Sequence, residues 1–123
     1  MDIEERFLKY VSIDTQSDEY SDTTPSTLKQ LDLGKELVKE MLELGITDAH
    51  LDEYGIVYGT IKGNGGTGDI IGFIAHMDTS PDASGTNIKP QKINNYDGSI
   101  IEINKELGLS LDPEEFVSLK KMV

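Results

Sequence analysis

The sequence contains no cysteine, only two histidines, and 11 basic residues against 23 acidic ones, which gives a formal net charge of −12. Without cysteine the chain forms neither a disulfide nor a thiolate metal site, and a reducing compartment suits it. The excess of negative charge argues against nucleic acid and anionic membranes as partners, because both would repel the protein. No apolar run approaches the roughly 18 residues of a membrane span. The charged start MDIEERF also lacks the apolar core of a signal peptide. These absences predict a soluble cytoplasmic protein.

Two helices are expected in the first 45 residues. Apolar residues at helical spacing predict a short amphipathic helix over residues 2–12 and a longer one after a polar, acidic loop. The longer helix is expected to begin at Thr24 and Pro25, because proline suits the first helical position. Gly45 is expected to end it as a C-terminal cap.

Strand-like patterns follow the second predicted helix. Residues 49–61 alternate as one or two strands broken near Gly55, and residues 69–75 form a nearly continuous apolar run. Such a run is typical of a strand covered on both faces. A hairpin is predicted around Asp97-Gly98, and a last helix is predicted to begin near residue 112. This order of elements predicts an α/β sheet with helices packed against it.

Several local patterns have ordinary explanations. The G-x-G-x-x-G string within residues 62–69 lacks a following helix to hold a pyrophosphate, so it predicts a hairpin turn. Glu114 and Glu115 follow Asp-Pro as acids in the first turn of a helix, and His50 reads as a surface or strand histidine. The acidic residues 14–22 predict either a solvated loop or a loop that borders a site.

His76 and Asp78 directly follow the predicted buried strand. Ligands of open α/β sheets gather beyond the carboxyl ends of the strands. Residues i and i+2 of an extended chain face the same side, so the Asp78 carboxylate can reach the His76 ring. A carboxylate on one ring nitrogen fixes the tautomer and raises the basicity of the other nitrogen. The pair therefore predicts either a metal ligand with its orienting acid or a structural hydrogen bond.

The longer string GFIAHMDTSPDASGTNIKPQ resembles the zinc-dependent M20 peptidase family, which carries a pattern like H-x-D-x-V-P after a buried strand. His76, Asp78 and Pro81 match that pattern, and Ser80 stands in place of the valine. The segments FLKYVSIDTQSD, TPST and DEYGIVYGTIKGN are also similar, in the same order, to the members of the family that cleave tripeptides. The resemblance covers essentially residues 1–123. It implies a catalytic domain built on a mixed β-sheet flanked by helices, and release of the N-terminal residue from tripeptides.

The resemblance also implies two zinc ions held side by side, with His76 as a ligand of one and Asp78 as the catalytic acid that clamps the His76 ring. The family's bridging Asp, its general-base Glu, its further acidic ligand and its second His are expected outside residues 1–123. The inserted dimerisation domain is expected to be absent as well. The sequence therefore predicts the N-terminal portion of an incomplete catalytic domain, which is inactive alone.

Two other functions stay open. The chain is alternatively a non-catalytic acidic α/β remnant or interaction module, or a part of another M20 hydrolase such as a dipeptidase or deacylase. A small peptide is the expected substrate of the whole enzyme. An exposed sheet edge leaves self-association open, because unpaired strand groups can pair with another chain.

Overall fold

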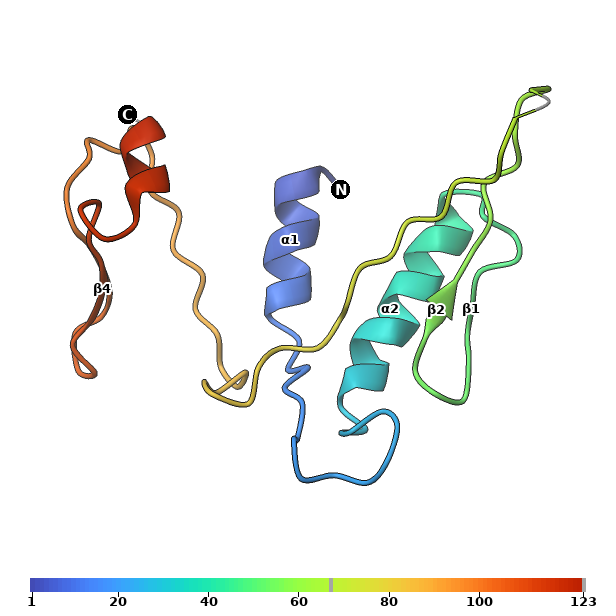
Figure 1. Ribbon diagram of the computed structural model, residues 1–123, viewed down its shortest axis with the longest axis horizontal. Helices are drawn as coiled ribbons and strands as arrows, with labels where there is room; N and C mark the ends of the chain where they lie inside the picture. The colour runs from blue at the N-terminus through green and yellow to red at the C-terminus, as the bar shows by residue number, and fades with distance from the viewer. Residues whose placement is uncertain (67, 123) are drawn as a thin grey trace. The chain divides into compact units, whose positions relative to one another are not determined.

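The chain divides into two compact units, Met1–Pro90 and Gln91–Val123. The computed structural model describes residues 1–66 and 68–122 (Figure 1). The first unit contains helices α1 (Ile3–Val11) and α2 (Gln30–Glu43) and strands β1 (His50–Leu51) and β2 (Val57–Tyr58). The second unit contains strands β3 (Ile101–Asn104) and β4 (Leu109–Leu111) and the 3-10 helix η1 (Val117–Lys121). No helix in these described ranges is both long and apolar enough to cross a membrane.

Helix α1 forms where the sequence predicts it. Asp2 and Glu5 make a reciprocal capping box: the Glu5 N–H donates to Asp2 Oδ1 at 2.8 Å, and the Asp2 N–H donates to Glu5 Oε2 at 2.9 Å. These two bonds satisfy backbone donors that a helix start otherwise leaves unpaired. The signal lies within four residues, so the sequence alone is enough to place the helix.

Helix α2 begins at Gln30, so the predicted start at Thr24-Pro25 is wrong. The side chains of Ser26 and Thr27 are hydrogen-bonded to the loop that precedes α2. The Asp18 N–H donates to Ser26 Oγ at 3.1 Å, and Thr27 Oγ1 donates to the Gln16 carbonyl at 2.7 Å. Because these two side chains bond to the loop instead of capping a helix, the first helical residue lies further along the chain than predicted.

The predicted end of α2 at Gly45 is confirmed. Gly45 has a φ of +88°, the left-handed conformation that glycine adopts without strain. The Ile46 N–H donates to the Met41 carbonyl at 2.9 Å, and the Gly45 N–H donates to the Leu42 carbonyl at 3.0 Å. This pair of bonds is a Schellman motif, which satisfies the last carbonyls of the helix.

Glu40 of α2 links the two helices. Glu40 has an exposed fraction of 6%, and its carboxylate accepts hydrogen bonds from the Tyr10 hydroxyl at 2.5 Å and from Lys9 Nζ at 3.0 Å. Arg6 Nε lies 3.2 Å from the same carboxylate. The Tyr10 and Lys9 hydrogen bonds lower the pKa of Glu40, while burial and the bond to Glu40 raise the pKa of Tyr10. The apolar core is small: within residues 1–66 and 68–122, Leu33 is the buried hydrophobic residue, with an exposed fraction of 7%.

Strands β1 and β2 confirm the predicted break near Gly55. They pair antiparallel with His50 opposite Tyr58 and Leu51 opposite Val57, and Gly55 turns the chain with a φ of +82°. The rings of His50 and Tyr58 stack with their centroids 5.3 Å apart. His50 is therefore an ordinary strand histidine, as its sequence context predicts.

The predicted buried strand over residues 69–75 is wrong. These residues form an extended, irregular segment without strand pairing (Figure 1). Ile70, Phe73 and Ile74 are 94–101% exposed. A strand needs a neighbour that pairs its backbone groups, and within residues 1–66 and 68–122 no segment pairs with this one. Over those ranges the chain has two small antiparallel sheets, and it lacks the mixed sheet flanked by helices that the resemblance implies. The same lack of a following strand leaves the hairpin predicted at residues 62–69 unformed, and its Thr67 lies outside the described residues.

The hairpin of the second unit lies further along the chain than predicted. Strands β3 and β4 pair antiparallel through a turn that ends at Gly108, whereas Asp97 accepts the Ser99 N–H at 3.0 Å in a local turn of its own. The predicted last helix is partly confirmed. Asp112 Oδ1 accepts the Glu114 N–H at 2.8 Å within a turn. Glu114 and Glu115 therefore precede the short helix η1 instead of lying in its first turn, and its N-cap, Phe116, makes no side-chain capping bond. Val123 lies outside the described residues.

Candidate functional site

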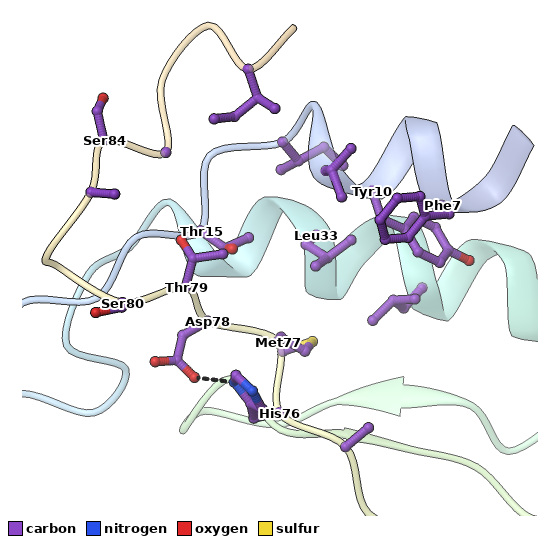
Figure 2. Close-up of a pocket in the computed structure, with 17 residues that line it drawn as sticks. Phe7, Tyr10, Thr15, Leu33, His76, Met77, Asp78, Thr79, Ser80 and Ser84 are labelled. Carbon is purple, nitrogen blue, oxygen red and sulfur yellow. Dashed lines mark hydrogen bonds and ion pairs between the residues drawn. The ribbon is translucent and has the colours of Figure 1, made fainter. Parts of the chain in front are cut away.

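His76 and Asp78 form the contact that the sequence predicts. His76 Nδ1 lies 3.1 Å from Asp78 Oδ1 (Figure 2). The predicted setting at a strand end is not observed, since the chain is irregular there. A neutral imidazole that donates from Nδ1 carries its lone pair on Nε2. The arrangement therefore frees Nε2 to bind a cation, and the His76 side chain is 84% exposed.

The pair lies between two cavities of the first unit. A cavity of about 680 Å³ is lined by apolar side chains of both helices, among them Phe7, Leu33 and Leu37, and by the chain around His76 and Asp78 (Figure 2). A second cavity of about 660 Å³ lies against β2 and is lined by the same His-Met-Asp segment. The pair is thus reachable by a ligand, and the first cavity offers apolar surface beside it.

The segment after Asp78 is held by residues 14–17. Gln16 and Thr79 form a parallel β-bridge. The Thr79 N–H donates to the Thr15 carbonyl at 3.2 Å, and the Thr79 carbonyl accepts from the Ser17 N–H at 2.9 Å. Thr15 is 3% exposed, so the acidic loop is anchored rather than free in solvent. Residues 14–17 of the predicted loop therefore contact the chain beyond Asp78, whereas residues 18–20 are exposed. That the loop borders a functional site stays a prediction.

Sequence reasoning missed the role of residues 14–17 in fixing the chain beyond Asp78. Gln16 and Thr79 are 63 positions apart, and neither belongs to a motif with a fixed spacing. The only available signal was the density of hydroxyl and amide side chains in IDTQSD. Such side chains are common in ordinary turns, so that signal does not identify a partner.

The donor set fits one position of a zinc site and not a whole site. Structural and catalytic zinc sites use three or four protein ligands. Throughout residues 1–66 and 68–122, no three side chains of His, Cys, Asp or Glu come together in a way that could hold a metal ion. His76 with Asp78 has the chemistry of a single histidine ligand and the carboxylate that orients it. Further ligands would have to come from elsewhere.

Comparison with known proteins gives matches along nearly the whole chain. A protein named peptidase T from Desulfitobacterium hafniense strain Y51 is 57% identical over 116 residues, which are 94% of this chain and 28% of that protein. Peptidase T of Clostridium acetobutylicum is 50% identical over 118 residues, covering 95% of this chain and 29% of that protein. Peptidase T of Aliivibrio fischeri is 50% identical over 124 residues, covering 99% of this chain and 30% of that protein. No family model matches the chain.

Identity at this level over nearly the whole chain shows homology to a group of peptidases. The chain is a homologue of peptidase T. It spans about three-tenths of the length of the curated relatives that it matches.

Proposed function

We propose that the chain supplies one zinc ligand, His76, and its orienting acid, Asp78, to a tripeptide aminopeptidase of the peptidase T type. The observation that carries the proposal is the 3.1 Å contact between His76 Nδ1 and Asp78 Oδ1. It leaves Nε2 as the ligating nitrogen on an exposed ring, in a chain 57% identical to a peptidase T. Zinc, when bound, polarises a peptide carbonyl and lowers the pKa of water.

Asp78 contributes to this site through His76. Its carboxylate accepts a hydrogen bond from Nδ1–H, which fixes the ring tautomer and restricts rotation of the ring about its side-chain bonds. Metal-binding histidines generally use such a carboxylate partner. Loss of an orienting carboxylate typically costs about 10–100-fold in metal affinity or activity.

The fold proposed for the whole enzyme includes an M20-type catalytic domain, of which residues 1–123 form the N-terminal portion. In it, residues 70–75 form a strand of a mixed sheet flanked by helices. Their extended course and their exposed isoleucine and phenylalanine side chains support this assignment. The general base and the remaining zinc ligands belong to other parts of the enzyme, so the chain alone is inactive. We place the enzyme in the cytoplasm, with small peptides as substrates.

A chimera tests this function. The 116 matched residues of the Desulfitobacterium peptidase T are replaced by the corresponding residues of this chain, and hydrolysis of a tripeptide is measured with and without zinc. We expect a zinc-dependent activity that His76→Ala reduces to background. The matched control is His50→Ala, which removes the other histidine of the chain and should retain activity, because His50 stacks on Tyr58 instead of facing Asp78.

Two results would contradict the proposal. Equal activity of the chimera with His76→Ala would show that the ring binds no essential metal. A folded but inactive chimera would favour a non-catalytic module. The substrate class is checked in the same assay: faster hydrolysis of dipeptides or of acylated amino acids would assign the chain to another M20 activity.

A further inference from the structure

The Gln16 side chain forms two hydrogen bonds to the loop that follows Asp78. Its Nε2 donates to the Pro81 carbonyl at 3.1 Å and to the Ala83 carbonyl at 2.9 Å. Both hydrogens of the amide group are therefore used on a segment more than 60 residues further along the chain. A side-chain amide with two carbonyl acceptors holds a loop in one path, because a displacement of either carbonyl breaks a bond.

Gln16 is itself fixed to residues that directly precede α2. Its carbonyl accepts from Thr27 Oγ1 at 2.7 Å, and its N–H donates to Asp14 Oδ1 at 3.0 Å. Lys29 Nζ lies 3.4 Å from Gln16 Oε1 and 3.0 Å from Asp14 Oδ2. A cation beside Oε1 sets which end of the amide carries oxygen, so Nε2 faces the two carbonyls. The residue thus connects the segment before α2 to the loop beyond Asp78.

The loop is held at two further points. Thr79 is bonded through both of its backbone groups to residues 15 and 17. Thr86 Oγ1 donates to Asp14 Oδ2 at 3.0 Å. Gly85 approaches so closely that a Cβ atom there would lie 2.6 Å from Asp14 Oδ1. Residues 79–86 therefore follow the surface that residues 14–17 present, and Asp78 directly precedes this segment.

We propose that Gln16 is a positioning residue that keeps Asp78 facing Nδ1 of His76. The role follows from geometry: the backbone of Asp78 continues into a segment fixed at Thr79, Pro81 and Ala83, so the direction of its side chain is set by that segment. The inference rests on the proposed function in one respect, which is that the His76–Asp78 contact orients a zinc ligand. The contact and its support by Gln16 are testable without catalysis.

The experiment uses the whole 123-residue chain, labelled with ¹⁵N, and the variants Gln16→Met and Gln16→Glu. Methionine keeps the side-chain length and removes the two hydrogen bonds, whereas glutamate also places negative charge beside two carbonyl oxygens. The first readout is the tautomer of the His76 ring from long-range ¹H–¹⁵N spectra, recorded well above the ordinary imidazole pKa of roughly 6.5. The second readout is hydrogen exchange of the Thr79 N–H.

We expect the unchanged chain to show His76 protonated on Nδ1 and a protected Thr79 amide. Both variants should shift His76 toward a mixture of tautomers and speed exchange at Thr79 by about tenfold to a hundredfold, since two hydrogen bonds are lost. Gln91→Glu is the matched control. It makes the same change in the second unit, where Gln91 Nε2 donates to the Ile103 carbonyl at 3.3 Å, and should alter neither readout.

Several results would overturn the inference. One is an unchanged tautomer in Gln16→Met, and another is an unprotected Thr79 amide in the unchanged chain. Exchange of the Leu44 N–H, which donates to the Glu40 carbonyl at 2.9 Å in α2, reports on folding in general. Faster exchange at Leu44 in the Gln16 variants would mean a general structural role and would also overturn it. An inactive chimera with these readouts intact would count against the proposed function and leave the positioning role standing.

Discussion

Ile74→Ser is expected to weaken the association of this chain with the rest of a peptidase T by about tenfold to a hundredfold. The Ile74 side chain is 101% exposed, so all of its surface is available for burial by a partner. Complete burial of an isoleucine side chain stabilises a complex by about 1.5–3 kcal/mol. A serine at the same position loses most of this binding free energy. Because each 1.4 kcal/mol is about a factor of ten in the dissociation constant, the loss is large enough to measure.

Phe73→Ser tests the opposite face of the same segment. Successive side chains of an extended chain point to opposite sides. The Phe73 and Ile74 variants therefore test burial on opposite faces of the segment. Phe73 is 94% exposed and has a comparable area to bury. Weakening by both variants would mean that residues 70–75 become a strand covered on both faces, as their apolar run indicates. Weakening by one alone would mean a strand with one open face.

The assay is calorimetric titration of the purified chain with the part of the Desulfitobacterium peptidase T that the chain does not match. Ile3→Ser is the matched control, because Ile3 is 86% exposed in the first turn of α1, outside the extended segment. Its dissociation constant should equal that of the unchanged chain. The reasoning is refuted if Phe73→Ser and Ile74→Ser both bind as tightly as the control.

Three further predictions concern the chain by itself. With His76 as a single ligand, the chain should bind zinc by only about 4–5 kcal/mol, between high micromolar and millimolar; stoichiometric zinc after dialysis against a mild chelator would contradict this. The Gln16 N–H, Lys29 and Thr86 lower the pKa of Asp14 below 3.8, so its stabilisation of the loop is complete above that pH and disappears as the pH falls through the lowered pKa. Exchange of the Thr79 amide should speed up in that range, and Asp14→Asn should remove the dependence. Asp2→Ala should destabilise α1 by about 1 kcal/mol; unchanged exchange at the Glu5 N–H would exclude this.

The features that could be predicted from the sequence depend on residues close together in the chain. The capping box of α1 joins Asp2 to Glu5, and the Schellman motif at Gly45 joins residues within five positions. The start of α2 could not be predicted, because Thr27 is bonded to a residue eleven positions earlier. The hairpin was predicted at the wrong turn, because Asp-Gly suits any tight turn. The pairing of β3 with β4 places the hairpin turn before Gly108 instead.

The outcomes at residues 69–78 differ for a physical reason. Burial of the apolar run depends on a neighbouring strand, and over residues 1–66 and 68–122 none pairs with it. The His76–Asp78 contact needs only two side chains two positions apart and a fixed chain beyond them, and it forms beside a fully exposed Ile74. The strand is therefore not what orients the pair. Gln16 and Thr79 hold the chain beyond Asp78, so the first unit contains the His76–Asp78 contact while Ile70, Phe73 and Ile74 are exposed.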